Sequence, residues 1–213
     1  MKITLVRNRL RMWRIIEFIL ISLFPVSIIT FGLAPSVFRY AVLLGIAVYA
    51  GSAIFYRKWT RHDLGFRKDT LIFWKPYLVW TVLAMLTIIV VHHVLHMPFI
   101  TWDYVTLGKL IAISILLSCI QEFLYRGYLF RLFQDITHHV GWVVVINIIV
   151  FTYMHTIFPH WEIIIPLTAA GGILFAVLYK KYPNVYLVSA MHCVLNFTAL
   201  YLGFFPVELL HMH

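Results

Sequence analysis

Long uninterrupted apolar runs constrain this chain more than any other feature of its sequence. Residues 111–120, for example, contain no charged side chain, and comparable runs recur along the 213 residues. About 20 apolar residues in a helix cross a bilayer core, whereas membrane β-strands alternate polar and apolar residues. Continuous runs therefore predict an all-α fold, a polytopic bundle of transmembrane helices.

We expect about seven transmembrane helices in a single membrane domain, 1–213. Only 12% of the residues are charged and 62% are hydrophobic, whereas about a quarter of the residues of a soluble domain are charged. Pro-containing segments separate several of the runs. The expected spans are residues 12–33, 37–56, 72–97, 107–125, 142–158, 163–181 and 185–205.

Basic residues predict the orientation of these spans. If the N-terminus is cytoplasmic, 15 of the 17 Lys and Arg residues lie in inside segments, and only Arg39 and Lys109 lie outside. This asymmetry favours a cytoplasmic N-terminus. It also explains the net charge of +9 without a nucleic-acid partner. Segments 57–69 and 134–141 would be cytoplasmic loops, and a short amphipathic helix over 128–137 would lie at the inner interface.

Three pairs of polar or aromatic residues, each four positions apart, stand out within the spans. An ionisable group inside a bilayer is costly and is a functional candidate by default. Each pair also has a simpler interpretation: a salt bridge at a helix end, a core histidine, or polar contacts between helices. The pairs are Glu122 with Arg126, Phe151 with His155, and His192 with Asn196.

Taken together, these residues supply the inventory that hydrolysis requires. A carboxylate or imidazole can take a proton from water, and further donors can stabilise the oxyanion that forms on an attacked carbonyl. Because the pairs lie on three separate spans, they can converge on one cavity. We therefore expect a shared, water-accessible pocket.

The order Glu-x-x-x-Arg, Phe-x-x-x-His and His-x-x-x-Asn on consecutive hydrophobic helices resembles the CPBP intramembrane proteases. This family includes CaaX prenyl proteases and bacteriocin-processing or bacteriocin-immunity proteins. The segment 126–130 and the Gly171-Gly172 pair also fit. The resemblance covers residues 108–200 and leaves the helices within 12–97 as accessory. It implies a multi-pass protein of the bacterial cytoplasmic membrane that hydrolyses a membrane-associated peptide near the cytoplasmic leaflet.

The first motif departs from the family pattern. The family normally has two consecutive glutamates, whereas this chain has Gln121 followed by Glu122. The resemblance places Gln121 at the water-activating position and Arg126 at the arginine that orients both acidic residues. A carboxamide cannot act as a base. Three explanations stay open: a variant in which Glu122 and His155 suffice, a non-proteolytic relative, or an engineered change.

The resemblance also assigns the remaining polar residues. His155 matches the histidine that shares the attacking water, and His192 and Asn196 match the residues that bind the substrate carbonyl or oxyanion. If a Zn ion takes part, Glu122, His155 and His192 would be its ligands, although no HExxH helix is present. We expect no permanently bound metal.

Two alternative functions belong to other classes. The same fold could serve as a non-catalytic binding, regulatory or bacteriocin-immunity protein, disabled by Gln121 and acting on a membrane-protein partner. A small transporter or haem-handling protein is suggested only by the 11 histidines, most of which lie outside the spans.

Overall fold

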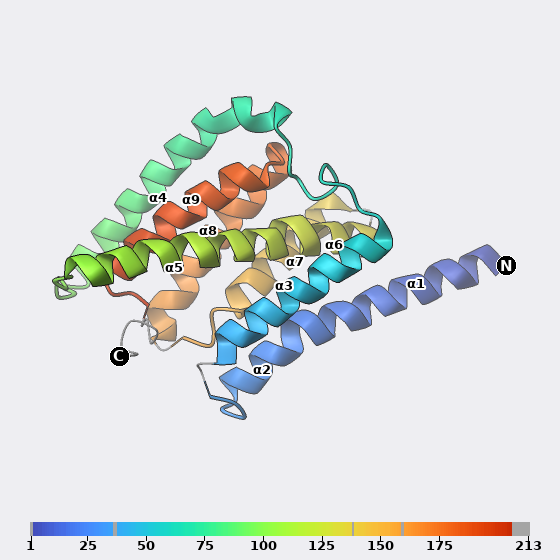
Figure 1. Ribbon diagram of the computed structural model, residues 1–213, viewed down its shortest axis with the longest axis horizontal. Helices are drawn as coiled ribbons and strands as arrows, with labels where there is room; N and C mark the ends of the chain where they lie inside the picture. The colour runs from blue at the N-terminus through green and yellow to red at the C-terminus, as the bar shows by residue number, and fades with distance from the viewer. Residues whose placement is uncertain (1, 36–37, 138, 159, 206–213) are drawn as a thin grey trace.

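Helices make up nearly the whole described part of the chain. The computed structural model describes residues 2–35, 38–137, 139–158 and 160–205, and contains no strand within these ranges (Figure 1). The elements are α1 (Lys2–Phe18), the π-helix η1 (Ile19–Leu23), α2 (Phe24–Thr30), α3 (Phe38–Arg57), the 3₁₀-helix η2 (Asp69–Phe73), α4 (Trp74–Val94), α5 (Tyr104–Glu122), the π-helix η3 (Phe123–Leu129), α6 (Phe130–Ile136), α7 (Val140–Tyr153), α8 (Trp161–Lys181) and α9 (Val185–Tyr201).

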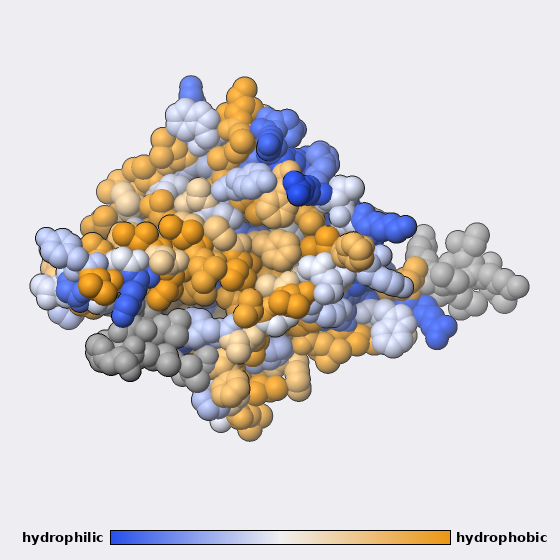
Figure 2. Space-filling model, viewed as in Figure 1, coloured by the Kyte–Doolittle hydropathy of each residue, from blue (hydrophilic) through white to orange (hydrophobic). Residues whose placement is uncertain are grey.

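Seven apolar helical segments correspond to the expected spans. Five are long enough to cross a membrane, and two, α7 and α9, are shorter apolar helices. Large apolar side chains cover much of the surface in Figure 2, as expected where lipid is the solvent. The all-helical, polytopic fold is confirmed.

The expected short helix over 128–137 is present as α6, but it is continuous with the preceding span. The π-helix η3 joins α5 directly to α6, so one helical stretch runs from Tyr104 to Ile136. Tyr128 and Leu132 are fully buried. Neighbouring helices cover the apolar side of this segment, and its position at the inner interface stays a prediction.

Helix α9 lies at the centre of the site-bearing half, beside α5 and α4, while α7 lies beside α8 (Figure 1). The loop before η2 closes one end of this arrangement. The Val185 amide donates to the Gly65 carbonyl over 2.9 Å, and Asn184 Nδ2 donates to the Arg67 carbonyl over 2.6 Å. Three predicted inside segments, namely the N-terminus, the 57–69 loop and the α8–α9 junction, thus lie toward one end of the bundle (Figure 1). The orientation in a membrane stays a prediction.

A buried carboxylate ties the N-terminal helices to the rest of the bundle. Glu17 of α1 accepts hydrogen bonds from Arg57 Nη2 at 2.5 Å, from the Tyr49 hydroxyl at 3.1 Å and from the Tyr128 hydroxyl. Arg57 and Tyr49 belong to α3, and Tyr128 belongs to η3. The Glu17–Arg57 charge pair therefore joins α1 to α3, and hydrogen bonds of both residues with the Tyr128 hydroxyl join these accessory helices to the core.

Candidate active site

Two side-chain hydrogen bonds, one helical turn apart, join the polar faces of α5 and α9. Glu122, the last residue of α5, accepts a hydrogen bond from His192 Nδ1 over 2.6 Å. One turn away, Asn196 Nδ2 donates to Ser118 Oγ over 3.2 Å. The i, i+4 spacing within each helix places both partners on the contact face. Residues of the first and third predicted pairs, Glu122 and His192, are therefore in direct contact.

Arg126 completes this group from the π-helical segment. Its Nη1 donates to Glu122 Oε1 over 3.0 Å, and both side chains are fully buried. The guanidinium carbon lies 4.7 Å from the Phe151 ring centroid and 5.2 Å from that of Phe175. Burial of either charge alone would be very costly, so each stabilises the other.

His155 lies just beyond the end of α7, and the expectation that it sits within a continuous helical span is wrong. The helix ends at Tyr153, and the His155 amide donates to the Thr152 carbonyl in a turn. Its Nδ1 lies 2.7 Å from the Phe151 carbonyl oxygen. Because a carbonyl oxygen only accepts, Nδ1 carries the proton, and Nε2 of the neutral ring can accept one.

Phe151 brings the separate motifs to one place. Its ring centroid lies 4.7 Å from the His155 ring and 5.7 Å from the His192 ring, besides covering Arg126. Gly172 of α8 allows this position, since a Cβ there would lie 3.1 Å from Phe151 Cδ1. The Gly-Gly pair noted in the sequence therefore supports the site through packing.

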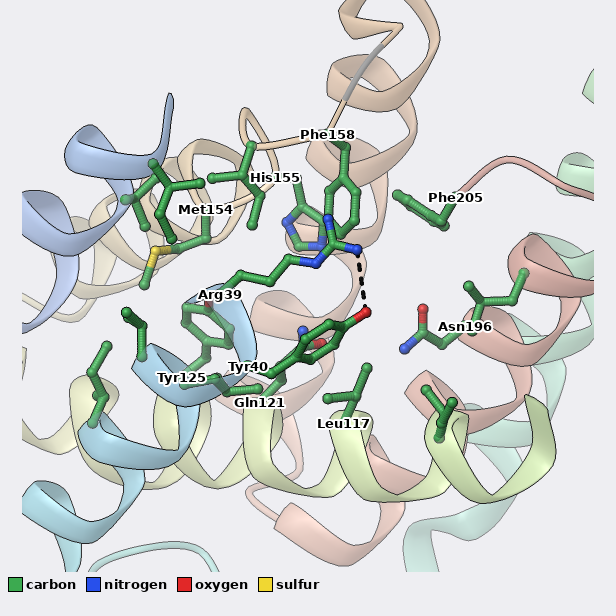
Figure 3. Close-up of a pocket in the computed structure, with 18 residues that line it drawn as sticks. Arg39, Tyr40, Leu117, Gln121, Tyr125, Met154, His155, Phe158, Asn196 and Phe205 are labelled. Atoms are coloured by element: carbon green, nitrogen blue, oxygen red, sulfur yellow. Dashed lines mark hydrogen bonds between the residues drawn. The ribbon is translucent and has the colours of Figure 1, made fainter. Parts of the chain in front are cut away.

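Gln121, His155 and Asn196 line a cavity of about 110 Å³ beside this group (Figure 3). Its volume accommodates several water molecules. Arg39 extends across the cavity and donates to the Tyr40 hydroxyl over 3.2 Å. Gln121 Oε1 is buried and has no hydrogen-bond partner among the described residues. Aliphatic side chains from α2, α3 and α5 form most of the remaining wall.

The six candidate residues thus divide into two adjoining sets. Glu122, Arg126 and His192 form a buried, hydrogen-bonded group that does not line the cavity, whereas the other three do. The two sets are connected in three ways. Gln121 and Glu122 are neighbours in α5, His192 and Asn196 lie one turn apart in α9, and the Phe151 ring contacts residues of both sets. Their catalytic roles stay predictions.

Residues 102–198 match the family described as Rce1-like, type II CAAX prenyl endopeptidase Rce1-like. This matched segment carries all three motifs and contains the whole hydrogen-bonded group described above. The family of this match is the CPBP family, and we call the matched segment the CPBP core. No curated protein and no solved structure matches the chain. The chain is therefore a multi-pass membrane protein with the core of a protease family, and the match begins and ends close to the expected 108–200.

The suggested zinc ligands of this CPBP core do not fit a metal site. Within the described ranges, no three His, Cys, Asp or Glu side chains are arranged to hold a metal ion. Glu122 Oε1 already accepts from Arg126 and His192, while His155 faces the separate cavity. No step is therefore assigned to a metal.

Sequence reasoning missed three buried polar residues of the CPBP core and its support. Ser118 pairs with Asn196, and Asn147 Nδ2 donates to the Tyr125 carbonyl over 2.7 Å. Glu17 anchors the accessory helices, as described above. A lone acidic residue inside the first span was a signal that could have identified Glu17, whereas Ser118 resembles any small residue at a helix contact.

The cavity extends from Gln121 toward the end of the bundle at which α2 and α7 terminate. On α3 it is lined by residues of the first half, such as Arg39, and on α9 by residues of the last half, such as Leu200. This end is opposite to the basic N-terminal end. With a cytoplasmic N-terminus, the cavity would therefore lie toward the outer face of the membrane. This position disagrees with the expectation that cleavage occurs near the cytoplasmic leaflet.

Proposed function

We propose that this chain is an intramembrane endopeptidase that hydrolyses a peptide held in the bacterial cytoplasmic membrane. The observation that carries the proposal is a cavity large enough for several water molecules that His155, Asn196 and Gln121 line. It lies beside the buried Glu122 carboxylate within the CPBP core. An imidazole with a free Nε2 and two amide donors provide a proton acceptor and oxyanion donors in a low-dielectric environment.

Each residue then has a distinct role. His155 Nε2 takes the proton from the attacking water and returns it to the leaving amine. The amide groups of Asn196 and Gln121 donate to the carbonyl oxygen as it becomes negative. Glu122 holds His192 and Arg126 in place and, through the shared α5–α9 contact, fixes the position of Asn196. The buried carboxylate thus acts mainly on geometry, and the cavity residues act on the reacting atoms.

The substrate side follows from the cavity and from the basic residues together. Because the cavity faces away from the basic end, the positive-inside rule directs it toward the outer face. We therefore favour a peptide reached from that side over one reached from the cytoplasmic leaflet. Labelling of a cysteine introduced at Tyr40 by a membrane-impermeant maleimide in intact cells, with Lys58→Cys as the control at the other end, distinguishes the two directions.

Cleavage of fluorogenic lipopeptides in vesicles tests the reaction itself. Loss of a positioned general base reduces the rate by about 10²–10⁴-fold, so His155→Gln should be inactive by comparison with the natural sequence. His160→Gln is the matched control, since His160 is exposed and pairs with Glu162 at 3.6 Å. Equal rates for the two variants would overturn the role of His155.

A non-catalytic binding or immunity function is the second candidate, because an amide rather than a carboxylate faces the cavity. Gln121→Glu distinguishes it from the first. Cleavage only by Gln121→Glu would indicate a site disabled by Gln121, and no cleavage by any variant would favour binding of a peptide or membrane-protein partner. Cleavage by the natural sequence supports the protease.

A further inference from the structure

A second cavity, of about 310 Å³, lies at the basic end of the bundle, away from the candidate active site. It is enclosed by the loop before η2, by η3 and α6, and by the end of α8. Its wall contains the charged residues Asp63, Arg67, Arg126, Arg131 and Lys180, together with His62 and Tyr179. Four of these side chains are cations and one is a carboxylate, so the cavity favours an anion.

The carboxylate offsets only one of these four positive charges. Asp63 accepts hydrogen bonds from the Thr60 hydroxyl at 2.7 Å and from the Thr60 amide at 2.8 Å. The side-chain bond and the backbone bond both lower the pKa of Asp63 below its ordinary value. Asp63 is therefore ionised at neutral pH but is already engaged within its own turn.

Several guanidinium N–H groups of two residues that line the cavity are themselves buried, with almost no accessible surface, and have no partner within the described part of the chain. They are Nε and Nη2 of the fully buried Arg126, and Nε of Arg131. Arg126 uses only Nη1 toward Glu122, and Arg131 uses Nη2 toward Asp135 at 3.4 Å. Buried donors without acceptors are uncommon, and guanidinium groups favour oxyanions with several acceptor oxygens.

We propose that this cavity binds a phosphate group, supplied by the head group of an anionic phospholipid or by a free phosphate. Basic pockets between membrane helices at the cytoplasmic side suit such head groups, and the positive-inside prediction places this end there. A neighbouring cavity shares Arg131, Gln134 and Val140 and adds Arg11, Arg14 and Asp135. Asp135 pairs with Arg14 and Arg131, so the basic surface extends toward α1 mainly through Arg11. The proposal is independent of peptide hydrolysis.

Arg126 connects the proposed phosphate site with the candidate active site. Arg126 lines this cavity and donates to Glu122 through Nη1. A bound anion would therefore add a second negative charge near the guanidinium and stabilise the buried group.

Lipid retention by the full-length protein tests the proposal. Native mass spectrometry would measure binding of phosphatidylglycerol and of phosphatidylcholine to the natural sequence, to Arg131→Gln/Lys180→Gln and to Arg61→Gln/Lys181→Gln. The last double variant removes the same charge from the same end, but neither residue lines the cavity. Circular dichroism would verify that all three remain folded.

Each basic residue contributes about fivefold to binding at an anionic surface, so the cavity variant should bind phosphatidylglycerol roughly 30-fold more weakly. The control should change by less than about threefold, because its side chains lie outside the site. Displacement of the lipid by inorganic pyrophosphate would identify free phosphate as an alternative ligand, while resistance to displacement would identify the lipid head group. If the two double variants bound phosphatidylglycerol with equal affinity and also bound inorganic pyrophosphate with equal affinity, the proposal would be overturned.

Discussion

Removing the charge of Glu122 should destabilise the fold far more than removing any exposed carboxylate. Glu122 and Arg126 are both fully buried and lie 3.0 Å apart. Glu122→Gln keeps the shape of the side chain but leaves the guanidinium without a counter-charge. Breaking one partner of a buried pair costs about 3–5 kcal/mol, and His192 loses a charged acceptor as well. We therefore expect a loss within that range.

Thermal unfolding in detergent, followed by circular dichroism, measures this loss. For a chain of this length, about 3–5 kcal/mol corresponds to a decrease in Tm of roughly 6–20 °C. Glu162→Gln is the control: Glu162 is 71% exposed and pairs with His160 at 3.6 Å, so its removal should cost less than about 1 kcal/mol.

A double variant separates the charge from the shape. In Glu122→Gln/Arg126→Met both charges are gone, so no unpaired ion is buried and most of the stability should return. A decrease of less than about 1 kcal/mol for Glu122→Gln would refute the reasoning. The reasoning would also be refuted if Glu122→Gln/Arg126→Met were no more stable than Glu122→Gln.

Two glycine substitutions test the packing of the site and of the loop. Gly172→Ala should lower the rate of peptide cleavage by about tenfold, because the new Cβ would lie 3.1 Å from Phe151 and displace its ring. Gly171→Ala is the control and should not lower the rate, because its nearest contact would be 3.8 Å. Gly65→Ala should lower the Tm, because its Cβ would meet the Tyr179 ring at 2.8 Å and Gly65 has φ +75°; an unchanged Tm would contradict this.

Much of the fold could be predicted because the thickness of the bilayer fixes the length of an apolar helix that crosses it. The expected spans 37–56 and 163–181 agree closely with α3 and α8. The end of α7 could not be predicted, since the apolar pattern continues beyond Tyr153 while the backbone turns there. The π-helical junction of α5 and α6 was also missed, because its hydrogen-bond shift leaves no mark on hydropathy.

Some contacts among the candidate site residues could be predicted from the sequence, but their arrangement could not. Spacing of four residues placed Glu122 with Arg126 and His192 with Asn196, and those relations hold. Nothing in the sequence indicated which side of α5 would contact α9 and which would face a cavity. That choice depends on how three helices pack around Phe151, a contact between residues far apart in the chain.

The neighbours Gln121 and Glu122 show why this arrangement matters for function. Consecutive residues of an α-helix point about 100° apart, so when Glu122 faces His192, Gln121 must face elsewhere, and it faces the cavity. A carboxylate at position 121 would therefore add a proton acceptor where water can enter, without disturbing the buried pair. Arg39 lines the same cavity and would offset part of the cost of that new charge. Gln121→Glu should consequently fold as the natural sequence does, and any change in its cleavage rate would report on cavity chemistry rather than on stability.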